Sequence, residues 1–588
     1  MASTRLTRTA KAFIAATIVG VTGFSVLHNR GLLDKLAPAA SGKRVASSVP
    51  PFVTLPGEEA KTPGPGCAGA NEVRFEHFAW NAQMGLMLAT GGPSATRGSA
   101  MCQRGVNLRL IREDSTDKMQ ADMLVFAEAL KKGEADPKVG VQFVAIMGDG
   151  AAQFLKGVND KLAALGPEYT AAVVGSAGYS RGEDKLMVPP SWRDSPESAR
   201  GGLVAGVLRD GDWNIALKWL GDNRIPNNPD ESAYDPDALN WVGASDYIDA
   251  AQKYVNGYCA DLVNVKSGKK EKHCVDGVVT WTPGDVVVAE KRGGAVSIVS
   301  TREYRSQMPN VIIGNRKWMS AHRDTVKGML SAIFEAGDRI KSDDMALREA
   351  SGVSAVVYKE KDAAYWYRYF NVQRTLDQKG LSVELGGSAV NNLADNGELF
   401  GLTKGALNAF AATYTVFGEV VRSQYPALLP SFPAAAEVTD TSYLEDLLAA
   451  GTISAADVRR FDEGERVKQV LSRRAWDIRF TSGSAVFTPD AQRELAKLRD
   501  DLVIASGAVV EIHGHTDAQG TAERNMALSE QRAFAVKRWL TSASASTFPE
   551  GRVRVFAHGQ GEPVDSNTTD EGRAKNRRVV IVIGASGV

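Results

Sequence analysis

The stretch Val509–Leu540 decides the fold of the C-terminal part of the chain, and it reads VVEIHGHTDAQGTAERNMALSEQRAFAVKRWL. Its opening residues are apolar and β-branched, which favours a strand that ends in a Gly-His-Thr-Asp loop. From Ala522 onward the apolar residues recur at helical spacing, so the sequence predicts a helix over Ala522–Leu540. A strand, a polar loop and a long helix therefore follow one another, as in a small domain with mixed α+β structure.

The loop and the helix together bring polar residues to one place. Positions three or four apart share one face of a helix. One acid, Asp517, lies in the loop, and one base, Arg532, lies on the expected helix that follows it. The acid suits an ammonium group, and the base suits a carboxylate held by two parallel hydrogen bonds. The pair therefore predicts a site for a zwitterionic group.

A second motif follows in Val553–Ile583, which reads VRVFAHGQGEPVDSNTTDEGRAKNRRVVIVI. With the first motif it closely resembles the OmpA-like, or OmpA/MotB C-terminal, peptidoglycan-binding domain over residues 476–588. The resemblance implies non-covalent recognition of the diaminopimelate side chain of the cell-wall peptide. The residues that it implicates are Asp517, Arg532, Thr516, Asn525, Leu528, Ser529 and Arg577.

The histidines and cysteines of the chain carry no recognisable metal motif. His513 and His515 form a His-x-His pair, but a third ligand is not evident in the sequence, so we expect no metal and no cofactor. The four cysteines are Cys67, Cys102, Cys259 and Cys274. The local pairings Cys67–Cys102 and Cys259–Cys274 are the ones we expect, and free buried thiols are the alternative.

The N-terminal segment has the features of an export signal or a membrane anchor. Ala12–Leu27 reads AFIAATIVGVTGFSVL and follows Arg5, Arg8 and Lys11. At 1.5 Å per residue it would span about 24 Å as a helix, slightly less than the roughly 30 Å of a hydrocarbon core. Residues 1–36 therefore predict a membrane anchor, or else a cleaved signal peptide. Both place the remaining chain in the periplasm of a Gram-negative-type bacterium, and the first predicts single-pass insertion in the inner membrane.

The chain beyond the anchor divides into four further segments. Residues 37–66 are rich in proline and predict a linker. Residues 67–445 alternate strand-like and helical stretches, which predicts a largely parallel, doubly wound α/β sheet. A charged stretch over Asp457–Arg474 predicts a helical connector at 446–475, and the C-terminal domain follows at 476–588.

The middle segment resembles periplasmic substrate-binding proteins of the nitrate, taurine and thiamine-precursor type. The resemblance rests on VRFEHFAWNAQMGLMLATGG near the start of the segment and on DGVVTWTP at Asp276–Pro283. It implies a two-lobed periplasmic-binding-protein type II fold, a small solute and an ABC-transporter partner or another envelope partner. The candidate solute-binding residues are Trp80, Asp149, Ser176, Ser180, Trp281 and Asp285.

The charge of the ligand stays open at this point. Gly148-Asp149-Gly150 precedes a helix, whose free N–H groups favour an anion, whereas the Asp149 carboxylate favours an amine. No Ser-His-Asp or Cys-His arrangement appears in a recognisable context, so we do not expect an enzyme.

The composition excludes one class of partner. The chain has 588 residues with 69 Lys and Arg against 69 Asp and Glu, a formal net charge of zero. A protein held to nucleic acid by a large positive field is therefore not expected. The sequence predicts an envelope protein that binds peptidoglycan and a small solute. A scaffold between membrane and wall, with no small ligand, is the alternative.

Overall fold

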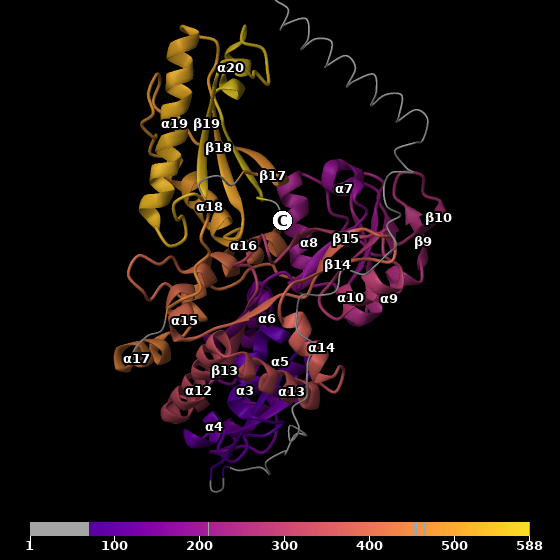
Figure 1. The fold of residues 1–588 in the computed structure, drawn as a ribbon, viewed down its shortest axis with the longest axis vertical. Coiled ribbons are helices and arrows are strands. Elements are labelled where there is room, and N and C mark those ends of the chain that lie inside the picture. The colour runs from indigo at the N-terminus through magenta and orange to yellow at the C-terminus, as the bar shows by residue number, and fades with distance from the viewer. Residues whose placement is uncertain (1–66, 68–69, 210, 452–454, 463–465, 587–588) are drawn as a thin grey trace, which may run out of the picture. The chain divides into compact units, whose positions relative to one another are not determined.

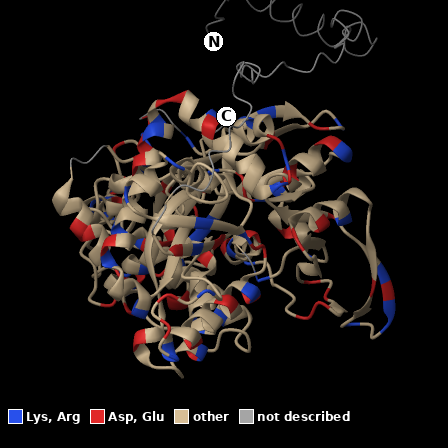
Figure 2. Ribbon diagram, turned by 90° about the horizontal axis from the view of Figure 1, so that it is seen from below, with Lys and Arg blue, Asp and Glu red and all other residues tan. Residues whose placement is uncertain are grey.

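A computed structural model of the chain describes residues 67, 70–209, 211–451, 455–462 and 466–586 (Figure 1). The expected membrane anchor and proline-rich linker lie outside the described residues. Among the helices that are described, none is both long enough and apolar enough to cross a membrane. Lys and Arg are interspersed with Asp and Glu over these elements, consistent with the zero net charge (Figure 2).

The first lobe is built on a sheet of described strands in the order β16-β4-β13-β3-β1-β2. Strand β3 consists of five buried apolar residues, as expected for a strand covered on both faces. β1 lies parallel to β2 and β3, but β13 runs antiparallel to β3 and β4, so the sheet is mixed rather than largely parallel. The strands are β1 Glu72–His77, β2 Asn107–Arg112, β3 Phe143–Met147, β4 Ala171–Ser180, β13 Pro309–Asn315 and β16 Ser388–Val390.

Helices with one apolar face pack on this sheet and on each other. Gly85 in α3 allows a close approach, because a Cβ there would lie 3.3 Å from the Ile333 carbonyl oxygen of α12. The helices of this part are α3 Met84–Thr90, α4 Ala100–Gln103, α5 Thr116–Lys131, α6 Ala151–Leu162, α11 Arg316–Ala321, α12 Arg323–Ser342, α13 Asp344–Tyr358, α14 Ala363–Phe370, α15 Leu393–Leu399, α16 Ala409–Gln424 and α17 Ser442–Ala450.

The second lobe has its own mixed sheet, in the order β12-β5-β11-β6-β8. Its strands are β5 Lys185–Val188, β6 Leu203–Gly206, β8 Asn240–Gly243, β11 Gly277–Thr280 and β12 Val296–Ser300. Its helices are α7 Ser191–Asp194, α8 Gly211–Asn223, α9 Tyr247–Val255 and α10 Gly284–Lys291. The short strand β7 Ala233–Tyr234 pairs with the β9–β10 hairpin, and β14 Gln373–Leu376 pairs with β15 Ser382–Leu385.

The chain passes between the two sheets twice, and a separate two-stranded sheet precedes its last strand in the first sheet. It enters the second sheet after β4, returns before β13, and reaches β16 of the first sheet after the β14–β15 hairpin. It then comes back to the first sheet once more, since Val173 N–H donates to the Val438 carbonyl oxygen at 2.9 Å and Asp440 N–H donates to that of Val173 at 2.8 Å. Two lobes joined by chain crossings are the architecture that the sequence predicted.

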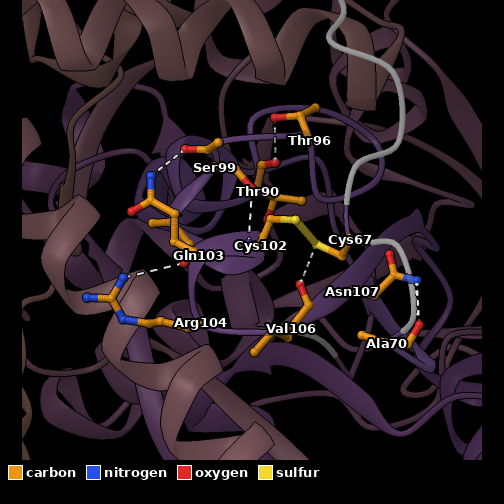
Figure 3. Close-up of a disulfide and its surroundings, with 12 residues drawn as sticks. Cys67, Ala70, Thr90, Thr96, Ser99, Cys102, Gln103, Arg104, Val106 and Asn107 are labelled. Atoms are coloured by element: carbon orange, nitrogen blue, oxygen red, sulfur yellow. Dashed lines mark hydrogen bonds between the residues drawn. A yellow bond between two sulfur atoms is a disulfide. The ribbon is translucent and has the colours of Figure 1, made fainter.

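Both expected disulfides are formed. Cys67–Cys102 ties the beginning of the described chain to helix α4, and Cys67 Sγ also lies 3.3 Å from the Val106 carbonyl oxygen (Figure 3). Cys259–Cys274 joins the paired ends of β9 (Cys259–Asn264) and β10 (Lys270–Cys274). The two local pairings are therefore confirmed.

The C-terminal domain is a sheet of described strands in the order β17-β20-β18-β19, with the long helix α19 packed along it (Figure 1). β18 runs parallel to β19 and antiparallel to β20. The elements are β17 Gln469–Trp476, α18 Ala491–Ile504, β18 Val509–His515, α19 Ala522–Ala543, β19 Val553–Gly559, α20 Asp570–Asn576 and β20 Val579–Ala585.

The helix expected over Asp457–Arg474 is wrong. Its described residues contain no helix, and Gln469–Trp476 instead forms β17 along β20. The ladder of hydrogen bonds to an apolar partner strand outweighs the local helical propensity of charged residues. Beyond β17, Phe480 and Phe487 form an isolated antiparallel bridge.

Candidate functional site

The Asp517 carboxylate lies in the loop after β18, close to an arginine. Its Oδ2 accepts a hydrogen bond from Arg577 Nη1 at 2.6 Å, and its Oδ1 accepts one from the Gln519 N–H at 3.0 Å. Asp517 is 7 % exposed, whereas the Arg577 side chain is 44 % exposed. An exposed partner can be displaced by a ligand at small cost, so the carboxylate is held in place and remains available.

Arg532 approaches the same region from α19 and is almost fully buried. Its Nε donates to the Ser484 carbonyl oxygen at 3.0 Å, and its guanidinium carbon lies 5.1 Å from the centre of the Phe480 ring. Burial lowers the pKa of Arg532 and the neighbouring charge of Arg577 lowers it further, while Asp517 raises it. The three charged groups thus influence one another, and the acid and the base expected from the sequence belong to one site.

The other residues expected at this site shape the loop. Asn525 Nδ2 donates to the Asp517 carbonyl oxygen at 3.1 Å, and Ser529 Oγ accepts from the Gly559 N–H at 2.9 Å. The Thr516 hydroxyl is buried and finds no hydrogen-bond partner among the described residues. Leu528 is half-buried on the same helix. These contacts fix the loop, and Thr516 offers a polar group that a ligand could use.

A histidine cluster adjoins this loop, and the sequence showed only part of it. His513 and His558 ring nitrogens lie 2.8 Å apart, and His558 Nδ1 lies 2.9 Å from Glu562 Oε1. Ligand atoms of His515, His558 and Glu562 lie within 4.8 Å of one another and could hold a metal ion. Two of these three groups, His558 and Glu562, were missed because they come from β19 and the residues after it, and β19 pairs with β18 only in space.

Between the lobes, the candidate solute-binding residues lie near the carboxyl ends of strands, where α/β sheets bind ligands. Trp80 follows β1, Asp149 follows β3 and Trp281 follows β11, and all three are buried. Asp149 Oδ2 accepts from Gln307 Nε2 at 2.8 Å. The indole nitrogens of Trp80 and Trp281 have no hydrogen-bond partner in the described part of the chain.

The remaining three candidates make internal contacts. Ser176 Oγ lies within β4 and bonds the Gly178 carbonyl oxygen. Ser180 Oγ lies 2.6 Å from Thr301 Oγ1, so it joins two of the crossing segments. Asp285 pairs with Lys185 at 2.6 Å. These residues hold the crossing segments together, whereas Trp80, Asp149 and Trp281 remain candidates for contact with a solute.

Three further acids lie at the same place and were not singled out in the sequence. Glu183 and Asp184 are fully buried in the first crossing, and the Asp184 carboxyl lies beside that of Asp212 at the start of α8. Burial raises the pKa of Glu183 well above its usual value and that of Asp184 to about 6. No periodic pattern marks the Arg-Gly-Glu-Asp-Lys stretch, so only the topology reveals its burial.

A hydrogen bond of Tyr247 is one of the side-chain contacts that join the lobes. Tyr247 Oη, from α9 of the second lobe, donates to Glu360 Oε2 at 2.6 Å, and Glu360 follows α13 of the first lobe. Arg112 Nη2 lies 3.1 Å from the same carboxylate. Burial and the charge of Glu360 raise the pKa of Tyr247, so the hydroxyl keeps its proton and donates. The two lobes are therefore in contact with each other in this structure.

Comparison with known proteins gives separate results for the two parts of the chain. The middle part is similar in fold to the periplasmic nitrate-binding protein NrtA from Synechocystis, at 10 % identity and a TM-score of 0.38, over 63 % of this chain and 92 % of that one. It is similar also to the alkanesulfonate-binding protein SsuA from Xanthomonas axonopodis, at 13 % identity and a TM-score of 0.36, over 63 % and 98 %.

The C-terminal part matches the OmpA family model at residues 479–577. The peptidoglycan-associated lipoprotein of Pseudomonas aeruginosa is 38 % identical over 17 % of this chain and 57 % of its own length. This chain thus spans less than two thirds of that relative. The peptidoglycan-associated lipoprotein of Pseudomonas putida is 33 % identical over 20 % of this chain and 68 % of its own length. Through its C-terminal domain, the chain belongs to the OmpA family.

Proposed function

We propose that the protein is a non-catalytic component of the cell envelope that binds peptidoglycan through its C-terminal domain. The observation that carries this proposal is the site formed by Asp517 and Arg532. An exposed arginine faces the acid there, and the base is almost fully buried. Membership of the OmpA family and the names of the peptidoglycan-associated lipoproteins support it.

The mechanism follows from the charges. The ammonium group of a diaminopimelate side chain replaces Arg577 at the Asp517 carboxylate, and the carboxylate of the same side chain binds the Arg532 guanidinium. Both contacts are charge-assisted hydrogen bonds, which are stronger than neutral ones. Because Arg532 is buried, water competes poorly for its guanidinium. A ligand with only an ammonium group or only a carboxylate would therefore bind only Asp517 or only Arg532.

Binding to purified peptidoglycan tests this site. We expect the Asp517→Asn and Arg532→Gln variants each to bind at least about tenfold more weakly than wild type, since truncating one partner of a charged contact costs roughly 2–5 kcal/mol. Arg493→Gln is the matched control, because Arg493 lies on α18 with a side chain that is 82 % exposed. Unchanged co-sedimentation of both site variants would show that the wall binds elsewhere.

The remaining parts extend this proposal to the whole chain. The apolar segment Ala12–Leu27 anchors the protein in the inner membrane as a single span, and the proline-rich segment 37–66 bridges part of the periplasm. Both lobes then lie in the periplasm, where disulfides form. An ABC transporter or another envelope protein is the partner that a solute-loaded domain would serve.

For the two-lobed domain we propose reversible binding of a small solute between the lobes. Support comes from the two chain crossings and from the buried polar groups without partners among the described residues near the strand ends. Such groups are costly to bury, so a ligand that pairs with them stabilises the closed form. A scaffold without a small ligand is the alternative, and a thermal-shift screen with the full chain separates the two: stabilisation by no compound would favour the scaffold.

A further inference from the structure

On the basis that the two-lobed domain binds a solute, the side chains between the lobes indicate the chemical class of that solute. The interlobe site is defined here by the acids Glu183, Asp184 and Asp212, together with Asp149 at the end of β3. All four are buried. Glu183 and Asp184 lie in the first crossing between the lobes, Asp212 belongs to the second lobe, and Asp149 belongs to the first. Acids from both lobes and from their connection therefore surround one region.

The glycine that begins α8 shows that the lobes meet here. A Cβ on Gly211 would lie 2.5 Å from Met147 Sδ and 3.2 Å from Asp149 Oδ1. The start of α8, which carries Asp212, is thus packed against the carboxyl end of β3. Since the Asp184 carboxyl lies beside that of Asp212, the first crossing reaches the same place. Asp149, Asp184 and Asp212 accordingly belong to one interlobe site.

Unpartnered amides face this region and are a second, independent observation. Asn310 is in register with Met147 and with Gly178, and residues opposite one another on antiparallel strands point to the same face. The Asn310 side chain therefore points to the face on which Met147 meets Gly211. Asn310 is fully buried, and neither polar atom of its amide has a hydrogen-bond partner among the described residues.

Two more amides cover the same face. A Cβ on Gly178 would collide with the Ala82 carbonyl oxygen, so the short helix η1 (Asn81–Gln83) lies over the strand next to Asn310. Asn81 and Gln83 are both fully buried, and each has an amide oxygen and nitrogen without a partner within the described ranges. Buried amides in native proteins are normally satisfied, so several unsatisfied ones in one place indicate that a polar ligand is missing.

The region holds more acidic than basic side chains. Lys185 faces Glu183 and Asp184, but its ammonium is already paired with Asp285 at 2.6 Å. The Glu183 carboxylate accepts a hydrogen bond from the Ser388 hydroxyl, and its Oε1 has no partner in the described chain. Burial raises the pKa of both Glu183 and Asp184. A positive ligand would relieve the cost of these buried carboxylates, and an anion would add to it.

The spacing of the acids favours an organic cation over a bare metal ion. Within the described residues, the group of three carboxylate, imidazole or thiolate ligand atoms lying within 4.8 Å of one another is in the C-terminal domain, at His515, His558 and Glu562. No three of the interlobe acids have ligand atoms that all lie within 4.8 Å of one another. Metal ions require ligands at about 2.0–2.6 Å, whereas an amine spreads its N–H donors over a larger volume.

We propose that the interlobe site binds an organic ammonium ion whose N–H groups donate to Asp184, Asp212 and Asp149. Free amide oxygens of Asn81 and Asn310 accept further N–H bonds. The buried indoles of Trp80 and Trp281 provide the aromatic surfaces on which cations are stabilised. Entry requires the lobes to open about the two crossings, as in other hinged binding domains.

Calorimetry and thermal shift on the full chain test the proposal with defined probes. The cationic arm contains ethanolamine, putrescine, spermidine and choline, and the other arms contain nitrate, methanesulfonate, CaCl₂ and MgCl₂. We expect at least one primary amine at about 1 mM to raise the Tm by several degrees, as a ligand well above its Kd does. Choline, which lacks N–H donors, should bind more weakly than the primary amines.

Variants connect any binding to the site. Asp184→Asn and Asp212→Asn should each weaken amine binding by about tenfold or more. Asp160→Asn is the matched control, because Asp160 is an exposed acid of α6. Asn310→Ser is a second probe that removes no charge, and it should also weaken binding.

Each outcome bears on a different statement. If an anion stabilises the protein and no amine does, the domain binds a solute and the cationic assignment is wrong. If no probe binds, both the cationic assignment and solute binding are refuted, while peptidoglycan binding is judged separately by co-sedimentation. Binding of Ca²⁺ or Mg²⁺ alone would replace the amine by a metal ion. Amine binding that survives all three site variants would place the ligand elsewhere.

Discussion

The carboxylates of Asp517 and Asp184 differ in how the surrounding residues balance their charge. Asp517 has an exposed arginine as its partner, so its charge is balanced without a ligand. Asp184 is fully buried beside Glu183 and Asp212, and the nearby Lys185 is committed to Asp285. The arrangement at Asp517 suits reversible exchange of its arginine partner for the ammonium group of a ligand. The arrangement at Asp184 makes the stability of the ligand-free domain depend on pH.

We predict that Asp184 destabilises the ligand-free protein as the pH rises. Its pKa of about 6 in the folded state lies above the usual value near 4, so the folded state binds the extra proton. Stability is then highest at low pH and is lost as the pH rises from about 4 through 6. Unfolding curves should show Asp184→Asn gaining about 1–3 kcal/mol over wild type between these limits.

Asp160→Asn serves as the control for this measurement, because that side chain is exposed and its pair with Lys156 contributes little. A difference between wild type and Asp184→Asn that does not vary with pH would contradict the assignment. The groups that face Asp184 are Glu183, Asp212, Lys185 and Asp285, and they are unchanged in the variant.

For single residues, the sequence predicted the proposed peptidoglycan site better than the interlobe site. Asp517 and Arg532 could be recognised because two motifs stand in order along a short segment. Asp184 and Asp212 could not, since they come from different elements and become neighbours only when α8 packs against β3. Asn310 likewise becomes informative only when its register with Met147 is known.

Elements of secondary structure carry the contacts on which closure depends. Helix α9 of the second lobe reaches the first lobe through Tyr247, which donates to Glu360 beside Arg112. The β9–β10 hairpin on the same lobe is closed by its own disulfide. Each of these features can be altered without touching the interlobe acids.

We predict that Tyr247→Phe favours opening of the lobes. A hydrogen bond to a charged group is worth roughly 1.5–3 kcal/mol, so the open population should rise by about tenfold or more. Hydrogen exchange over residues 247–255 and 358–362 should accelerate accordingly. Tyr258→Phe, at a side chain that is 42 % exposed, should leave both segments unchanged. Equal protection in the two variants would mean that this contact does not hold the lobes.

We predict that the second disulfide stabilises its hairpin locally. Closing a loop of 15 residues is worth about 3 kcal/mol in the chain-entropy description. The Cys259→Ser, Cys274→Ser double variant should be cut by trypsin faster at the exposed Lys269 and Lys270. The Cys67→Ser, Cys102→Ser double variant should leave this cleavage rate as in wild type, and a rate increase in both would indicate a global effect.

The elements also show where sequence periodicity fails. Most strands and helices were predictable because apolar residues alternate or recur with helical spacing. The charged stretch that ends in β17 was predicted as a helix, since arginine and glutamate favour helices locally. Its partner β20, an apolar strand at the end of the described chain, decides the structure instead.

For the whole molecule, the proposed attachments to membrane and wall are separable. We predict that replacing residues 1–36 by a cleavable signal peptide releases the protein into the periplasmic extract and leaves peptidoglycan co-sedimentation intact. Conversely, the variants Asp517→Asn and Arg532→Gln should stay in the membrane fraction and lose co-sedimentation. N-terminal sequencing of the wild-type protein provides the check, and a mature start near residue 40 would refute the anchor.

The positions at which the chain enters and leaves the two-lobed domain have a mechanical consequence. The disulfide of Cys67 fixes the entry to the first lobe, and the bonds of Val173 to the segment at Val438 fix the exit to the same lobe. Tension between membrane and wall would therefore enter and leave this domain along the chain through the first lobe. The second lobe is linked to the C-terminal domain by side chains instead, since Lys218 of α8 pairs with Asp501 of α18 at 2.7 Å, so its movement would be coupled to the wall-bound end.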